Sequence, residues 1–105
     1  MSNYMVLFYD KDGASASFDR QTETDSFAVW MNKLQNIVDR GAPFTAQAKT
    51  LTAPSSATDG TNSPQSPNGY CILSGSSIEE VQSLFADCPI FSSGGSVEIR
   101  EIFSV

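Results

Sequence analysis

The chain has 105 residues, and 12 acidic against 6 basic side chains give it a net charge of -6. This length fits one domain, and 40% hydrophobic residues suffice for a packed core. The clustered Lys and Arg that bind nucleic acid or an anionic membrane surface are missing, so we expect neither partner. No apolar run approaches the ~20 residues of a membrane span, and the start lacks the pattern of a secretory signal. With two widely spaced cysteines, these features favour the cytoplasm.

The first predicted element is a β-strand over residues 4–9, which are apolar throughout and end at a turn signal in residues 10–13. A strand that is apolar at every position indicates cover on both faces of the sheet. Next, apolar residues spaced by three and four predict a helix that Thr24 or Asp25 caps and that residues 41–43 end. Its apolar stripe consists of Phe27, Trp30, Met31, Leu34, Ile37 and Val38.

A weaker strand is predicted over residues 44–51, where apolar and polar residues alternate. Residues 52–68 are rich in Pro, Ser, Thr, Asn and Gly. This composition and length predict a long loop, which we expect to be mobile.

Strand character returns in residues 69–73. The sequence Ser77-Ile78-Glu79-Glu80 is typical of a capping box and predicts a second helix, which Pro89 stops. Gly94 and Gly95 then predict a turn, and the alternation of residues 97–102 predicts a last strand. The apolar stripe of this second helix consists of Ile78, Val81, Leu84, Phe85 and Cys88.

The resulting order, β-α-β-β-α-β, predicts one α+β domain over residues 1–105 with a ferredoxin-like fold. In this fold a four-stranded antiparallel sheet carries two helices on one face. The opposite face would expose aromatic and aliphatic side chains of the first and third strands, more than monomers usually leave in water. Packing two sheets face to face about a twofold axis would cover them. We therefore expect a homodimer formed through this face.

The chain resembles the YCII-related proteins, and most closely their DGPF-type branch. The similarity extends over nearly the whole chain, from residues 4–7 and the spacing of Trp30, Leu34 and Gly41 to four C-terminal motifs: Gly69-Tyr70-Cys71-Ile72-Leu73, Ser77-Ile78-Glu79-Glu80-Val81, Cys88-Pro89 and Gly94-Gly95-Ser96-Val97-Glu98-Ile99-Arg100. The name motif departs from the family, because Thr61 and Asn62 follow Asp59-Gly60 where Pro and Phe are usual. The resemblance implies a dimeric α+β barrel. The His–Asp pair that is thought to act in some relatives cannot be present, since the chain has no histidine.

The last predicted strand places Glu98 and Arg100 on one side and Val97 and Ile99 on the other. A dry helix interface would not accept two charges, so we expect the charged pair to face the partner sheet. Tyrosines are assigned to the same side because their hydroxyls need polar partners. The candidate ligand-binding residues are Tyr4, Tyr70, Glu98 and Arg100. The alternative is that Glu98 and Arg100 form an ion pair that only orients the dimer.

We expect no metal and no cofactor. Without histidine or a C-x-x-C motif, two cysteines do not make a zinc site, and residues 10–13 lack the further acidic ligands of a calcium loop. The second helix should return Cys88 to the level of Cys71, where we expect buried free thiols rather than a disulfide.

Three functions remain open. The leading one is the binding of a small, partly apolar molecule in the cleft between the two sheets of the homodimer. The second is a cofactor-free enzyme, a lyase, hydrolase or oxygenase, that acts on a small aromatic or keto compound; this rests on fold analogy. The third, which the family resemblance suggests, is a regulatory partner of a sigma factor. No residue is assigned a catalytic role.

Overall fold

The computed structural model describes residues 1–9, 20–45, 47–59 and 67–103. Its main sheet contains four antiparallel strands in the order β2-β5-β1-β6, and a separate two-stranded sheet contains β3 and β4. The elements in chain order are β1 (Ser2–Tyr9), α1 (Arg20–Asn32), β2 (Ile37–Pro43), β3 (Lys49–Ala53), β4 (Ser56–Asp59), β5 (Pro67–Gly75), α2 (Ile78–Ser83), the 3-10 helix η2 (Pro89–Ser93) and β6 (Ser96–Ile102).

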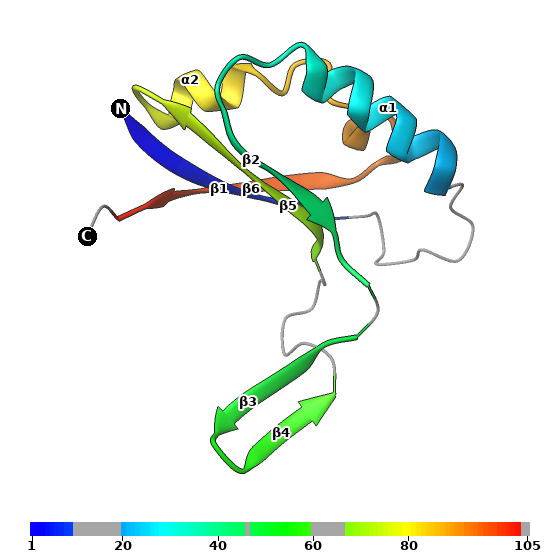
Figure 1. Cartoon of the computed structure of the whole chain (residues 1–105), viewed down its shortest axis with the longest axis vertical. Coiled ribbons are helices and arrows are strands. Elements are labelled where there is room, and N and C mark those ends of the chain that lie inside the picture. The colour runs from blue at the N-terminus through cyan, green and yellow to red at the C-terminus, as the bar shows by residue number, and fades with distance from the viewer. Residues whose placement is uncertain (10–19, 46, 60–66, 104–105) are drawn as a thin grey trace.

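Both α-helices lie on one side of the main sheet, and the β3–β4 hairpin projects away on the other side (Figure 1). The main sheet and the helices confirm the predicted ferredoxin-like α+β fold, with the hairpin inserted between the second and third strands of that sheet. No helix in the described part of the chain is long and apolar enough to cross a membrane.

The core lies between the main sheet and the helices. Along β1 every second residue is buried, and Trp30 of α1 packs against rings from both layers. Its ring centroid lies 6.4 Å from that of Phe8 and 5.0 Å from that of Phe85, and its indole N–H donates to the Leu84 carbonyl oxygen at 3.3 Å. The buried set comprises Tyr4, Val6, Phe8, Trp30, Met31, Cys71, Leu73, Val81, Phe85, Cys88 and Ile90.

Helix α1 is shorter at its C-terminal end than predicted. The predicted stripe continued to Val38, but the helix ends at Asn32, and residues 37–43 form β2. Asn36 is anchored to the neighbouring strand β5, because its carbonyl oxygen accepts from the Ser74 N–H at 2.8 Å. The β-branched residues Ile37 and Val38 fit the apolar pattern of a helix as well as that of a strand. The pairing of β2 with β5 places them in a strand. Helix α1 begins at Arg20, before both predicted cap residues, Thr24 and Asp25.

Gly41 has a role inside β2 rather than at a helix end. Its φ is +69°, and a Cβ atom there would lie 1.7 Å from the Tyr70 carbonyl oxygen. The register of β2 against β5 shifts between Asp39 and Ala42, on either side of this residue. A side chain would therefore meet both backbone strain and a clash at this irregularity.

The segment after β2 also differs from the prediction. Among the described residues of the predicted strand over 44–51, only 49–51 lie in a strand, β3. The predicted loop over residues 52–68 contains the end of β3, all of β4 and the start of β5. Thr50, Thr52 and Thr58 favour strands on either side of the turn at residues 54–55, which periodicity alone did not indicate. Residues 60–66, with most of the altered family motif, and the turn predicted at residues 10–13 lie outside the described residues.

Helix α2 begins as predicted but is short. The Ser77 hydroxyl accepts from the Glu80 N–H at 3.1 Å, while the Glu80 carboxylate accepts from Ser76 instead of completing the box with Ser77. The helix ends at Ser83, so Leu84 and Phe85 of the predicted stripe lie in turns, and Pro89 opens η2. Gly94 caps η2 with a φ of 80°, which confirms the predicted turn.

Candidate functional site

Strand β6 carries different chemistry on its two faces. Val97 and Ile99 are partly buried against the core, while Glu98 and Arg100 lie on the opposite side, as expected from the alternation. That side of the main sheet is not covered by the helices (Figure 1), and we call it the open face. By the strand registers, its central residues are Met5, Leu7, Tyr70, Ile72, Glu98 and Arg100.

A polar cluster of three side chains stands on this open face. The Tyr9 hydroxyl donates to Glu98 Oε1 at 2.8 Å, and the Arg100 guanidinium donates to Glu98 Oε2 at 2.9 Å. Glu98 thus uses both carboxylate oxygens and joins a residue of β1 to a residue of β6. We refer to these residues as the Tyr9–Glu98–Arg100 cluster.

The electrostatics of the cluster follow from these two hydrogen bonds. The bond from Arg100, followed by that from Tyr9, lowers the pKa of Glu98, so this carboxylate is ionised near neutral pH. The bond to Glu98, together with burial, raises the pKa of Tyr9, so the phenol keeps its proton. A carboxylate with a lowered pKa is a weak base and a phenol with a raised pKa is a weak acid. The cluster is therefore better suited to binding than to proton transfer.

Tyr70 lies on the open face but away from the cluster. Its hydroxyl donates to Asp39 Oδ2 at 3.4 Å, and its ring stacks on Phe44 with centroids 5.9 Å apart. Strand β1 separates it from β6. The structure therefore does not bring Tyr70 together with Glu98 and Arg100.

The assignment of Tyr4 to the open face is wrong. Tyr4 is 3% exposed and packs in the core with the other buried residues of β1. Burial, followed by the nearby charge of Glu101, raises its pKa. In a strand that is apolar on both faces, the sequence does not show which way the tyrosines point. Tyr4 and Tyr9 are five residues apart and therefore point to opposite faces.

The tyrosine that does join the cluster, Tyr9, was missed. Tyr9 is an even number of residues from Met5 and Leu7, so the alternation of a strand places all three on the same side of β1. The sequence did not show that this side is the open face. Its approach to Glu98 depends on the β1–β6 register, in which Leu7 pairs with Glu98 and Tyr9 with Ser96. Nothing in a single sequence specifies that register.

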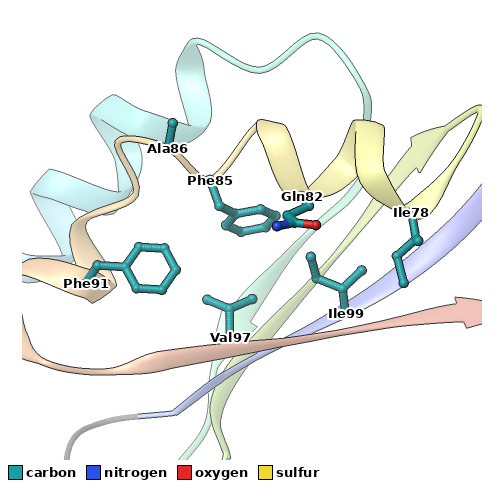
Figure 2. A pocket seen from close by; sticks show the side chains of 7 residues that line it. All are labelled: Ile78, Gln82, Phe85, Ala86, Phe91, Val97 and Ile99. Carbon is teal, nitrogen blue, oxygen red and sulfur yellow. The ribbon is translucent and has the colours of Figure 1, made fainter.

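A cavity of about 500 Å³ lies on the other side of β6, against α2 and η2 (Figure 2). Its lining does not include Glu98, Arg100 or a tyrosine. The cavity is lined by Ile78, Gln82, Phe85, Ala86, Phe91, Val97 and Ile99.

Both cysteines are buried thiols that form no disulfide, as predicted. Burial, with smaller effects of Cys88 and Asp39, raises the pKa of the Cys71 thiol to about 12, so it is unreactive near neutral pH. Among the described residues, no group of three or more His, Cys, Asp or Glu side chains could hold a metal ion.

No protein-family model matches the chain, and no curated protein matches it. Among solved structures it is similar to the 5-chloro-2-hydroxyhydroquinone dehydrochlorinase TftG of Burkholderia phenoliruptrix AC1100, in complex with 2,5-dihydroxybenzoquinone. The TM-score is 0.53 and the sequence identity 22%, over 91% of this chain and 90% of that one. At this identity the likeness shows the fold alone. The chain is thus an α+β protein with a ferredoxin-like fold.

Proposed function

We propose that the protein binds a small, partly apolar molecule in a cleft that two copies form from their open faces. The observation that carries this proposal is the Tyr9–Glu98–Arg100 cluster, which stands beside apolar side chains on the sheet face that neither α1 nor α2 covers. Small-molecule sites combine an apolar lining with a few polar groups that orient the ligand. The open face offers both.

The incomplete burial of the chain supports the homodimer. The β3–β4 hairpin belongs to a sheet of its own and leaves Leu51 59% exposed, although a two-stranded hairpin is marginally stable by itself. It projects on the side of the open face (Figure 1). A second copy packed there would cover both the hairpin and the open face.

The cluster favours a ligand with a planar anionic or hydroxylated group. Glu98 engages one guanidinium nitrogen of Arg100, and a guanidinium carries five N–H donors in a fork that matches carboxylates. Met5, Leu7 and Ile72 would contact the apolar part of such a ligand. The dihydroxybenzoquinone bound to TftG, a small oxygenated ring, is of the same kind. Membership of the YCII-related, DGPF-type branch forms part of this proposal, and the fold likeness supports it.

A cofactor-free enzyme that acts on a small aromatic compound is the second candidate, and the enzymatic activity of TftG favours it. The pKa shifts of Glu98 and Tyr9 weigh against it, because both shifts oppose acid–base catalysis near neutral pH. The role as a sigma-factor partner and the cytoplasmic location remain predictions.

Titration calorimetry with benzoate, hydroxyquinol and dihydroxybenzoquinone tests the binding site. Arg100→Ala should weaken binding of the best ligand about tenfold or more, as expected for a lost hydrogen bond to a charged group. Arg40→Ala is the matched control, since Arg40 is exposed and donates to Asn32 of α1. Equal effects of the two substitutions, or no binding of any ligand at millimolar concentration, would refute the proposed site.

Light scattering tests the dimer. The wild type should have twice the mass of the 11.3 kDa chain at micromolar concentration. Leu7→Lys places a charge in the open face and should yield monomers, whereas Val29→Lys, at a position 60% exposed on α1, should not. A monomeric wild type would contradict the homodimer and, with it, the cleft between two open faces.

A further inference from the structure

The cavity of Figure 2 is formed because α2 is too short to cover β6. The α-helix ends at Ser83 after six residues, and the chain then turns toward η2. Val97 and Ile99 of β6 are left only partly buried, and Ile78 and Phe91 at the rim are 41% and 50% exposed. Large apolar side chains from three elements thus surround one open volume of about 500 Å³.

The side chains that line the cavity are almost all apolar. Among the described residues, those around the cavity are apolar except for Gln82, and none is charged. In Figure 2 the Gln82 side chain lies between Phe85 and Ile78, above Ile99. An amide can both donate and accept a hydrogen bond, so one carbonyl, hydroxyl or ether group of a ligand could be satisfied there.

We infer that this cavity is a binding site for an uncharged, largely apolar small molecule with one hydrogen-bonding group, which Gln82 receives. Its volume falls within the range of about 300–1,000 Å³ usual for small-molecule pockets. A charged ligand would lose water here without gaining a partner, and the net charge of -6 further disfavours anions. Contact with the ligand would complete the burial of Val97, Ile99 and Phe91.

This site is separate from the proposed site on the open face. The two use alternate residues of the same strand, Val97 and Ile99 here and Glu98 and Arg100 there, so the sheet itself lies between them. Each site can therefore be altered without touching the other. The inference also does not depend on the homodimer.

Two probes that differ by one charge test the ligand class. Uncharged N-phenylnaphthylamine should bind the wild type saturably, with one molecule per chain and a rise in fluorescence. Its sulfonated counterpart, anilinonaphthalene sulfonate, should bind at least about tenfold more weakly. Equal affinities for the two probes, or no saturable binding of the uncharged one, would overturn the inference.

Three variants then locate the probe. Val97→Trp fills the cavity and Phe91→Ala removes one wall, and each should weaken binding about tenfold. Arg100→Ala, on the opposite face, should leave the affinity within about twofold. Phe91 is half exposed, so its substitution should leave the fold intact. Phe91→Ala therefore still tests whether the probe binds in the cavity if Val97→Trp unfolds the chain. Wild-type affinity in Phe91→Ala, or lost binding in Arg100→Ala, would overturn the site. So would binding that weakens as protein concentration rises, since a second copy would then occupy the cavity.

Discussion

The two faces of the main sheet carry similar apolar side chains, but these side chains differ in how far they are buried. On the helix-covered face, Val6 and Leu73 are fully buried. On the open face, Leu7 and Ile72, their immediate neighbours in the same two strands, are only partly covered. Hydropathy therefore does not distinguish the two faces; the number of helices does, because two helices cover one face of a four-stranded sheet. The covered face supplies stability, and the open face is the one on which we propose that a ligand binds.

The largest effect is expected on the covered face, at Trp30. Its side chain is 2% exposed and contacts the rings of Phe8, Phe27 and Phe85. Trp30→Ala should lower the free energy of unfolding in urea by about 3–5 kcal/mol, through lost transfer energy and a cavity. Val29→Ala, at a neighbouring exposed position, should change it by less than about 0.5 kcal/mol. Similar losses in both variants would contradict the placement of the core under α1.

Cys71 makes the covered face sensitive to alkaline pH. Its pKa is raised from 9.0 to about 12 in the folded chain, so above pH 9 the unfolded chain loses this proton first. Stability should not depend on this group at neutral pH and should fall from about pH 9 toward 12, by at most about 1.4 kcal/mol per pH unit. Urea unfolding of Cys71→Ala across this range should show a shallower decline than the wild type. Parallel declines would mean that Cys71 is not buried in this way.

On the open face, the expected change is local. Tyr9→Phe removes one of the two hydrogen bonds that lower the pKa of Glu98, so that pKa should rise toward its ordinary value. An NMR titration of the Glu98 carboxyl group would measure the change. Tyr70→Phe is the matched control, because the Tyr70 hydroxyl donates to Asp39. A Glu98 pKa that responds equally to both variants would break the cluster assignment.

The smallest effect is expected in the β3–β4 hairpin, which adds nothing to the covered core. Lys49 and Asp59 form an ion pair there, with side chains 66% and 88% exposed. Because water screens such a pair, Lys49→Ala should change the urea midpoint of the main sheet by the equivalent of less than about 0.5 kcal/mol. A loss above about 1 kcal/mol would contradict the exposure of this ion pair to water.

Several features were predictable because they depend on short-range patterns. The alternation of β6 separated Val97 and Ile99 from Glu98 and Arg100 with no knowledge of the rest of the fold. The Ser77 cap and the Gly94 turn are likewise set by local hydrogen bonding and backbone freedom. The order of the main elements followed from these signals, and with it the ferredoxin-like topology.

By itself, the sequence determined the order of the main-sheet strands and the two α-helices, and which residues of β6 would share a face. Only the tertiary structure decided that Ile37 and Val38 join a strand, that Tyr4 is buried, and that Tyr9 reaches Glu98. The physical reason is that β-branched residues fit more than one local structure and an all-apolar strand can turn either face to the core. Contacts with distant parts of the chain decide such cases. Pairing with β5 places Ile37 in a strand, packing under the helices buries Tyr4, and the register with β6 brings Tyr9 to Glu98.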